Sequence, residues 1–357
     1  MHLVASFLLV SVICFFSDLA GRHRRAVNVV ILLIAFLILF VPLAVRHESV
    51  GIDTLAYYKI FDLIASVSNP YSTLRYELGY TVLNRLVYYF DGRASIVIFV
   101  SAAISLVPAF FLLYKYGRSY LMSISILLGM NIYGFMFNGV RQAVAMGVLM
   151  LSLHFYLKGR TALFLVFVIL ATTFHFTAIV FLALLFLDKA RIGAKLAVLA
   201  WLVSMFFVSP WGAGLLMPYF KFFVPSDYLP YIEGGVTDQG LRVRFLANQL
   251  FCLLCIFFIN VRESAKIDET GLTLLYLTFY GFLFSNVVSQ MGFMDRIPLY
   301  FSMFAFISLP YVASCVVNRR SFYLLVGFLF VVFSLFYLRG LSLGSNGMLP
   351  YSTIWKL

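Results

Sequence analysis

Residues 27–45 have the sequence VNVVILLIAFLILFVPLAV, a run without a charged residue. It lies between the basic cluster Arg22, Arg24 and Arg25 and the next basic residue, Arg46. A helix needs about 20 apolar residues to cross the hydrocarbon core of a bilayer. The run has this length and composition, so it predicts a transmembrane helix with basic residues at both ends.

The composition of the whole chain agrees with this prediction. Of its 357 residues, 63% are hydrophobic and 11% are charged, whereas a soluble domain has about 25% charged residues. A bilayer is the solvent that suits so much apolar surface. The net charge of +12 would suggest a nucleic-acid partner in a soluble protein. Here the basic residues lie in short loops between apolar runs, so membrane topology explains them and no nucleic-acid partner is expected.

Similar apolar runs recur along the chain and predict an all-α polytopic integral membrane protein. We expect about twelve membrane segments, several of them shorter than a full span. No soluble module is apparent, so residues 1–357 are expected to form a single transmembrane domain. The predicted segments are 2–17, 27–45, 94–114, 120–137, 140–157, 161–174, 176–187, 195–209, 245–260, 270–288, 297–316 and 321–338.

The distribution of Lys and Arg predicts which loops face the cytoplasm. Loops rich in these residues stay on the cytoplasmic side. That side then carries the basic residues near 22–25, 115–118, 158–160, 189–195, 262–266 and 319–320. Both termini face outside, together with the long loops 46–93 and 210–244. This predicts a multi-pass protein of the cytoplasmic (inner) membrane whose active site faces the periplasm or the exterior and is formed partly by these two loops.

The outer segment 46–93 contains two amphipathic patterns. The first predicts a helix lying in the membrane interface over residues 52–67, and the second indicates another apolar face after residue 80. The first consists of Ile52, Leu55, Ala56, Ile60, Leu63, Ile64 and Val67, and the second of Leu83, Leu86, Val87 and Phe90.

Arginines are more frequent on the predicted outer side than the positive-inside rule allows. Three of them, Arg141, Arg244 and Arg296, are each expected in the first turn of a helix entering the membrane, where a cation opposes the helix dipole. Asn138 and Asp295 resemble N-caps for two of these helices. Free N–H groups and a guanidinium together favour an anion site. The alternative is that the arginines extend towards lipid headgroups.

Three other polar residues stand out on this side. His175 lies in an otherwise apolar stretch, where an ionisable group suggests function, and histidine transfers protons near neutral pH. Its alternative is a hydrogen-bonded packing residue. Asp53 is either a general base or the cap of the helix that follows it. Glu77 either orients an arginine or a sugar hydroxyl, or is simply solvated.

No metal and no cofactor are expected. Cys252 and Cys255 form a CxxC pair, but within a predicted membrane segment and without further ligands. The loops contain no cluster of carboxylates with metal spacing.

Five short motifs resemble those of the EpsG-like family of Wzy-type polysaccharide (O-antigen or exopolysaccharide) polymerases. They occur in the order that the family has, from the second predicted membrane segment to the eleventh. They are Gly51-Ile52-Asp53-Thr54 with Tyr57 after Arg46, Glu77-Leu78-Gly79-Tyr80, Asn138-Gly139-Val140-Arg141-Gln142 with Ala145, Phe174-His175-Phe176-Thr177-Ala178 and Asp295-Arg296.

The resemblance implies a GT-C-like fold and a glycosyltransferase reaction. The donor is a glycan on undecaprenyl pyrophosphate, and the acceptor is a repeat unit on a second lipid carrier. Arg46, Arg141 and Arg296 are then expected to bind pyrophosphate, with Arg242 and Arg244 assisting. His175 is the preferred base and Asp53 its competitor or orienting partner. Glu77, Asn138, Gln142 and Asp295 are the remaining candidates for substrate binding, and a chain-length-regulating membrane protein is a possible partner.

Three alternative functions stay open. A glycan ligase would use the same donor and similar arginines, and only the acceptor distinguishes it. A flippase needs charges along a central path, whereas the charges here gather at one face. A membrane acyltransferase needs a deep histidine reached from the cytoplasm, so the side on which residue 175 is labelled would distinguish it.

Overall fold

The computed structural model describes residues 2–20, 25–73, 76–223, 243–265 and 267–355. Among these residues the ordered elements are helices, and the only β-type pairing is an isolated bridge between Arg46 and Thr353. The chain divides into two compact units, residues 1–179 with 323–357 and residues 180–322. The expectation that residues 1–357 form one transmembrane domain stays a prediction.

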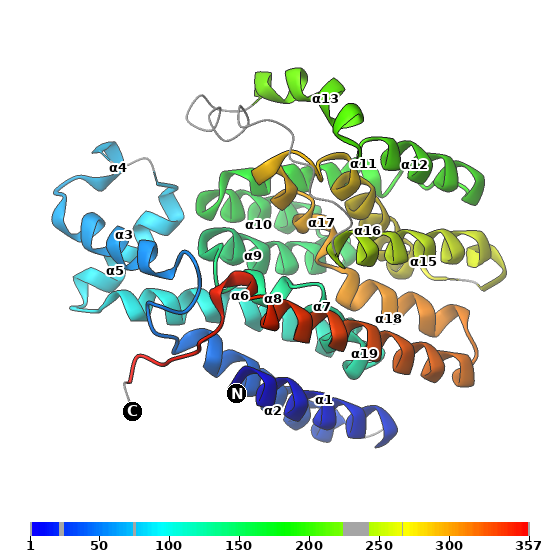
Figure 1. Ribbon diagram of the computed structural model, residues 1–357, viewed down its shortest axis with the longest axis horizontal. Helices are drawn as coiled ribbons and strands as arrows, with labels where there is room; N and C mark the ends of the chain where they lie inside the picture. The colour runs from blue at the N-terminus through cyan, green and yellow to red at the C-terminus, as the bar shows by residue number, and fades with distance from the viewer. Residues whose placement is uncertain (1, 21–24, 74–75, 224–242, 266, 356–357) are drawn as a thin grey trace. The chain divides into compact units, whose positions relative to one another are not determined.

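The first unit contains both chain ends and the loop 46–93 (Figure 1). Its helices are α1 (His2–Ala20), α2 (Arg25–Ala44), α3 (Thr54–Ser66), α4 (Pro70–Thr73), α5 (Leu78–Tyr89), α6 (Ala94–Tyr116), α7 (Tyr120–Gly129), α8 (Ile132–Phe135), α9 (Val140–Leu157), α10 (Thr161–Phe174), α19 (Arg319–Ser342, from Tyr323) and η4 (Ser345–Gly347).

The second unit consists of shorter and more broken helices. The 3₁₀ helix η1 (Phe176–Ala183) leads into it. Its own elements are α11 (Leu184–Leu187), α12 (Ala194–Phe206), α13 (Pro210–Phe223), α15 (Val243–Ala265), α16 (Glu269–Val287), η3 (Gly292–Arg296), α17 (Leu299–Ser302) and α18 (Ala305–Val316).

The helices confirm an all-α polytopic membrane protein but not the number of spans. Among the described residues, eight helices are long and apolar enough to cross a bilayer, and the pair Ala194–Phe206 and Pro210–Tyr219, bent by 89°, makes a possible ninth. Every predicted membrane segment coincides with helical residues. The count of about twelve is not confirmed, because Tyr120–Gly129, Thr161–Phe174 and Phe176–Leu187 are shorter than a full span.

Two predicted segments have a different local structure. The segment 120–137 is interrupted at Asn131, whose φ of 62° is left-handed and separates α7 from α8. The loop expected at 210–244 begins as a helix, α13, with Pro210 as its first residue, a position where proline is favoured. Residues 224–242 of that loop lie outside the described part of the chain.

Close packing holds the centre of the first unit together. Helix α9 lies between α6 and α10 (Figure 1). A Cβ atom on Gly147 would lie 2.1 Å from the carbonyl oxygen of Ile104, so only glycine lets α9 approach α6 this closely. Small residues serve this purpose between membrane helices. The position of α9 sets the position of Arg141 at its start.

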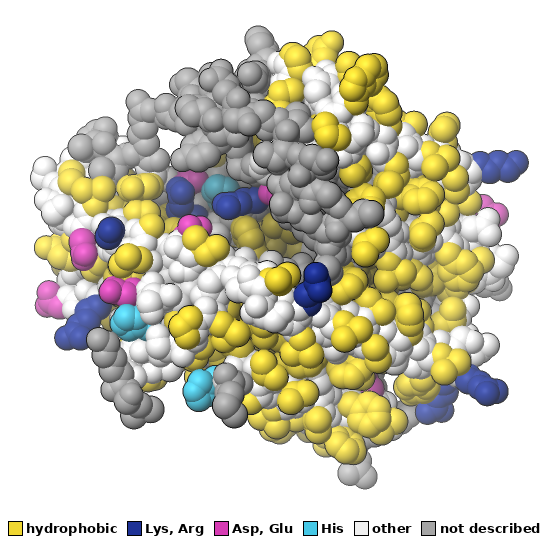
Figure 2. Space-filling model, viewed as in Figure 1, with side chains coloured by type: hydrophobic (Ala, Val, Ile, Leu, Met, Phe, Trp, Pro, Cys, Tyr) yellow, Lys and Arg dark blue, Asp and Glu magenta, His cyan; other side chains and the backbone are white. Residues whose placement is uncertain are grey.

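Polar residues of the first unit gather at two opposite ends. One end, which we call the basic end, contains Lys115 in the last turn of α6 and Lys158 just after α9. The two helices are joined there, since Tyr116 Oη and His154 Nδ1 lie 2.8 Å apart. The other, which we call the site end, contains Arg46, Glu77, Asn138, Arg141 and His175. Figure 2 shows hydrophobic side chains covering the visible face of α1, α2 and α19, whereas charged and histidine side chains gather over the end that carries α3 and α5.

Candidate active site

The loop 46–93 folds onto the site end through aromatic side chains. Tyr57 and Phe61 of α3 and Tyr80 of α5 are buried in one cluster with residues of α6 and α9, including Val140. The helix predicted at 52–67 is therefore present, but its buried face is Tyr57, Phe61 and Ile64, and Ile52, Leu55 and Leu63 remain exposed. The apolar stripe read from the sequence is thus mostly the outward face, and aromatic residues make the inward one.

Glu77 joins the two most distinctive side chains of the site end. Its Oε1 atom lies 3.0 Å from Nδ1 of His175, and its Oε2 atom accepts a hydrogen bond from Nη1 of Arg141. The three side chains come from the start of α5, the end of α10 and the first turn of α9. They are 17–23% exposed, so they are largely buried but reachable from the surface. One carboxylate therefore fixes a histidine and an arginine side by side.

The carboxylate also determines which nitrogen of His175 carries a proton. An ionised carboxylate only accepts hydrogen bonds, so Nδ1 must be the donor to Glu77. In the neutral ring this leaves a lone pair on Nε2. The arrangement orients the imidazole and stabilises the imidazolium that forms when Nε2 takes a proton, as a carboxylate does in catalytic triads.

The electrostatics favour an ionised Glu77. Burial on its own raises the pKa of this carboxyl, but the hydrogen bond from His175 and the charge of Arg141 outweigh burial and lower its pKa below the ordinary value. Burial raises the pKa of the Tyr57 phenol, and Arg141 offsets that only in part, so Tyr57 stays protonated beside the guanidinium. The Arg141 guanidinium carbon lies 5.7 Å from the centre of the Tyr76 ring, within cation–π range.

Gly79 explains how Glu77 reaches His175. A Cβ atom at position 79 would lie 2.4 Å from Oγ1 of Thr173 and 2.9 Å from its carbonyl oxygen. The start of α5 therefore touches the last turn of α10, two residues before His175. In the Glu77-Leu78-Gly79-Tyr80 motif, the glycine allows the contact that the glutamate uses.

Arg46 has different surroundings. It is 1% exposed. Its guanidinium donates to the carbonyl of Leu43, to the carbonyl of Phe137 at 3.4 Å and to Oγ1 of Thr54 at 3.3 Å. Burial lowers its pKa to about 10, so it keeps its charge near neutral pH. The described contacts make Arg46 a connection between the end of α2, the loop and the turn before α9, and its expected binding of pyrophosphate stays a prediction.

Gly51 and Thr54 of the Gly51-Ile52-Asp53-Thr54 motif belong to the same connection. Gly51 has a φ of +95°, and a Cβ atom there would lie 2.5 Å from the carbonyl oxygen of Phe137. Only glycine adopts this conformation without strain. Thr54 donates through Oγ1 to Val50 at 2.6 Å, with Phe137 at 3.3 Å. The glycine and threonine of the motif thus shape the turn that presents Asp53.

Asn138 is not the helix cap that the sequence predicts. The N-cap position of α9 belongs to Gly139. The Asn138 side chain accepts a hydrogen bond from the backbone N–H of Ile52 at 2.7 Å and donates to Oδ1 of Asn346 at 2.9 Å. Its carboxamide is used to hold the loop and the C-terminal segment together. The prediction failed because both partners are distant in sequence.

Asp53 and Gln142 occupy less distinctive positions. Asp53 is at the N-cap position of α3, yet its side chain makes no capping hydrogen bond, so the capping alternative is not supported. It is half-buried. Gln142 is 4% exposed within α9. Whether either binds substrate stays a prediction.

The remaining candidates belong to the second unit. Arg296 is exposed and ends the 3₁₀ helix η3, and Asp295 precedes it, half-buried. Asp295 is therefore inside a short helix and is not a cap, since the N-cap position of η3 belongs to Met291. Arg296 still lies near the start of the apolar span Met294–Val316. Arg242 lies outside the described residues, and α15 is described from Val243, so Arg244 is in its first turn.

Sequence reasoning missed several residues that build the site end. Tyr57 and Tyr76 contact Arg141. Asn346 belongs to the C-terminal segment, in which Gly347 also accepts a hydrogen bond from the N–H of Gly51 at 2.8 Å. Tyr57 was noted only as part of a motif. No periodicity or motif marks the last twenty residues as a support for the loop, because this contact spans almost the whole chain.

Among the described residues, no group of three or more His, Cys, Asp or Glu side chains is placed to hold a metal ion. The site end instead offers one carboxylate, one imidazole and one guanidinium in contact. This set can transfer a proton and stabilise an anion.

The fold and this site together define a polytopic membrane protein with a histidine–glutamate–arginine cluster at one end of its helices. Comparison with protein-family models identifies it further: residues 29–353 match the EpsG family. The chain belongs to this family, a Wzy-like polymerase family. No curated protein and no solved structure matches it. The resemblance read from the five motifs is thereby confirmed at the level of the family.

Proposed function

We propose that the protein is a polysaccharide polymerase that joins lipid-linked oligosaccharide repeat units. It transfers the glycan from an undecaprenyl-pyrophosphate-linked donor to the repeat unit on a second lipid carrier. Membership of the EpsG family supports the class of reaction. The observation that supports the mechanism is the single carboxylate of Glu77 in contact with both His175 and Arg141.

In the proposed reaction, His175 is the general base. Its Nε2 atom accepts the proton of the acceptor hydroxyl while Nδ1–H stays bonded to Glu77. The hydroxyl oxygen forms a bond to the anomeric carbon of the donor, and the bond from that carbon to the pyrophosphate oxygen breaks. The electron pair leaves with undecaprenyl pyrophosphate. The proton then passes from His175 to the solvent.

Arg141 stabilises the leaving pyrophosphate. The side chain is fixed before the reaction by Glu77 and by the Tyr76 ring, so little reorganisation is needed when charge develops. Arg296, in the second unit, stays a separate candidate for binding pyrophosphate. Fixed guanidinium groups can take the role that a divalent ion has elsewhere, so the reaction is proposed to be independent of metal.

The proposal changes the roles of Arg46, Asn138 and Asp53. Arg46 and Asn138 are proposed to position the loop 50–54 from within. Asp53, at the start of α3, orients a sugar hydroxyl rather than the imidazole, because Glu77 already orients the ring. The helices α3 and α5 lie in the membrane interface, and the fold is of the GT-C type.

The proposed location is the cytoplasmic (inner) membrane, with the site end facing outwards. The grouping of Lys115 and Lys158 at the opposite end of the first unit supports this orientation. In a cysteine-free background, Ile52→Cys, at a residue that is 70% exposed, is expected to react with an impermeant thiol reagent in spheroplasts, and Lys158→Cys is not. The reverse pattern would place the site in the cytoplasm and refute the proposed donor.

The polymer produced in cells tests the proposed function. A strain lacking this chain, complemented with His175→Ala, is expected to accumulate single repeat units and to make no polymer ladder. His154→Gln is the matched control, because His154 belongs to the basic end. A normal ladder from His175→Ala contradicts the mechanism. If the purified wild-type protein transfers glycan only to a lipid-A core acceptor, the protein is a ligase.

A further inference from the structure

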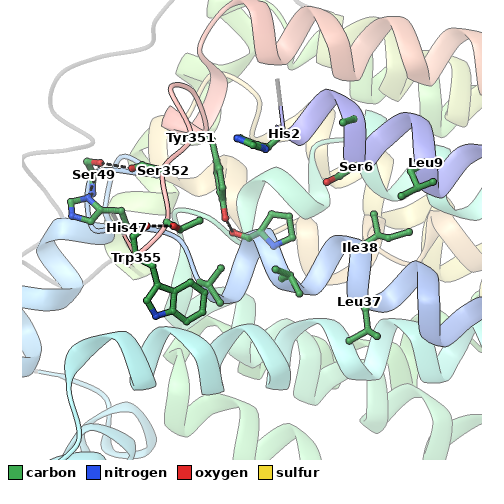
Figure 3. Close-up of a pocket in the computed structure, with 15 residues that line it drawn as sticks. His2, Ser6, Leu9, Leu37, Ile38, His47, Ser49, Tyr351, Ser352 and Trp355 are labelled. Carbon is green, nitrogen blue, oxygen red and sulfur yellow. Dashed lines mark hydrogen bonds between the residues drawn. The ribbon is translucent and has the colours of Figure 1, made fainter. Parts of the chain in front are cut away.

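A second potential ligand site lies beside the loop 46–93, within the first unit. It is a cavity of about 1090 Å³ between α1, α2 and the C-terminal segment 351–355 (Figure 3). The triad of Glu77, Arg141 and His175 does not line it. Its volume is slightly above the roughly 300–1,000 Å³ of typical small-ligand pockets.

The wall of this cavity is apolar and faces the bilayer. Leu9 of α1 and Leu37 and Val41 of α2 line it, and each is about half exposed, at 52%, 46% and 48%. All three belong to helices that are long and apolar enough to span the membrane. A ligand that covers these side chains would need an apolar part, such as a hydrocarbon chain, and could reach them from within the membrane.

The rim of the cavity is polar. His47, Ser49 and Ser352 lie together at one end of it, and His2 lies on the other side of Tyr351 (Figure 3). His47 Nδ1 lies 3.0 Å from Oγ of Ser49, which lies 3.4 Å from Oγ of Ser352. The described lining residues include no Asp or Glu, although Glu48 lies between His47 and Ser49 in the chain. Imidazole N–H and hydroxyl groups can donate hydrogen bonds to a phosphate group.

The rim is continuous with the connection formed by Arg46. The N–H of His47 donates to the carbonyl of Ser352, and the N–H of Ile354 donates to that of Val45, both at 3.0 Å. Arg46, between them, bonds the carbonyl of Phe137, four residues before Arg141. The rim therefore adjoins the backbone that supports the proposed active site.

We infer that this cavity binds the polyprenyl chain of a lipid carrier, with its phosphate at the rim formed by His47, Ser49 and Ser352. The inference rests on the proposed function, because a polymerase of lipid-linked glycans handles two such carriers and the cavity lies at the same end of the helices as the triad. A polyprenyl phosphate combines the long hydrocarbon chain that the wall requires with the phosphate that the rim can accept.

Photolabelling tests the occupant without requiring turnover. The purified wild-type protein in phosphatidylcholine nanodiscs is exposed to a diazirine-bearing undecaprenyl phosphate. Labelled peptides are expected from α1, α2 and residues 349–355. Excess unlabelled undecaprenyl phosphate is expected to prevent labelling, whereas the same excess of phosphatidylglycerol is expected to leave labelling unchanged. Equal competition by phosphatidylglycerol identifies an ordinary phospholipid site and overturns the inference, as does labelling confined to other helices.

Filling the cavity provides the second test. Leu37→Trp is expected to raise the KM for an undecaprenyl-linked donor or acceptor by about tenfold, the effect of losing roughly two buried methylene groups. The KM for a geranyl-linked analogue stays unchanged, because its chain is too short to use the wall. Ile34→Trp is the matched control, since Ile34 is also exposed on α2 but does not line the cavity.

The two proposals fail in different ways. A Leu37→Trp variant that treats long and short chains as the wild type does contradicts the cavity assignment while leaving polymerase activity intact. Absence of any glycan transfer by the wild-type protein contradicts the proposed function, and the photolabelling result then still decides whether the cavity holds a polyprenyl chain.

Discussion

Arg46 and Arg141 are both conspicuous in the sequence, yet their surroundings differ. Arg46 is 1% exposed and its guanidinium donates to the carbonyls of Leu43 and Phe137 and to Thr54. Arg141 is 23% exposed and is held by the carboxylate of Glu77, next to His175. The first arrangement satisfies a guanidinium within the fold, and the second leaves one at a surface that substrate can reach. The contacts of an arginine in a motif must therefore be known before that arginine can be assigned to substrate binding.

Of the two arginines, Arg141 is expected to have the larger effect on activity. Arg141→Ala is expected to reduce polymer formation by at least about 10²- to 10³-fold, because a fixed charge-assisted donor to the leaving group is lost. Arg141→Lys restores little, since lysine lacks the planar fork. Ladder assays and melting temperature measured on the same preparations check that folding is retained. A normal ladder from Arg141→Ala removes this residue from the site.

Arg46→Ala is expected to act on stability first. Leu43, Phe137 and Thr54 lose a buried donor, at a cost on the order of 2–4 kcal/mol. The variant should melt at a lower temperature in detergent than the wild type. Arg93→Ala, at an exposed residue of the same loop, is the control and should melt normally. An Arg46→Ala protein that melts like the wild type but cannot bind donor would place Arg46 in the pyrophosphate site after all.

Gly79→Val tests the contact between α5 and α10. The added side chain meets Thr173 and moves Glu77 away from His175. Turnover is expected to fall by about tenfold or more, an effect of misplacement well known for catalytic groups. Gly327→Ala is the control, because a Cβ atom there meets nothing within 4 Å. Native turnover in Gly79→Val would mean that the Glu77–His175 contact is dispensable.

The smallest expected effect is a change in stability with pH. The pKa of Glu77 is lower in the folded protein than its ordinary value, so its contribution to stability is complete above about pH 4.3 and declines as the pH falls through the folded-state pKa. The difference in melting temperature between wild type and Glu77→Gln should therefore shrink on acidification below that value. A difference that is constant over this range contradicts an ionised Glu77 as the source.

The sequence predicted the helices well and the contacts between them less well. Apolar runs are local, and each predicted membrane segment coincides with helical residues. His175, Glu77 and Arg141 were identified as candidates, but which carboxylate orients His175 depends on a contact between residues 98 positions apart. The sequence offered Asp53 as the competitor or orienting partner of His175, and Glu77 as the partner of an arginine or a sugar hydroxyl. Asn138 was misassigned as a cap because its partners, Ile52 and Asn346, lie 86 and 208 positions away.

The proposed reaction depends on His175, held by Glu77, acting as the general base. Single-turnover kinetics of purified His175→Ala and Asp53→Asn, with donor affinity measured separately on the same preparations, test this role. His175→Ala is expected to lose about 10²- to 10⁴-fold in turnover and to bind donor normally, and Asp53→Asn is expected to lose less. Native turnover in His175→Ala contradicts this role of His175, and so does a loss confined to donor affinity, which would place His175 in the pyrophosphate site.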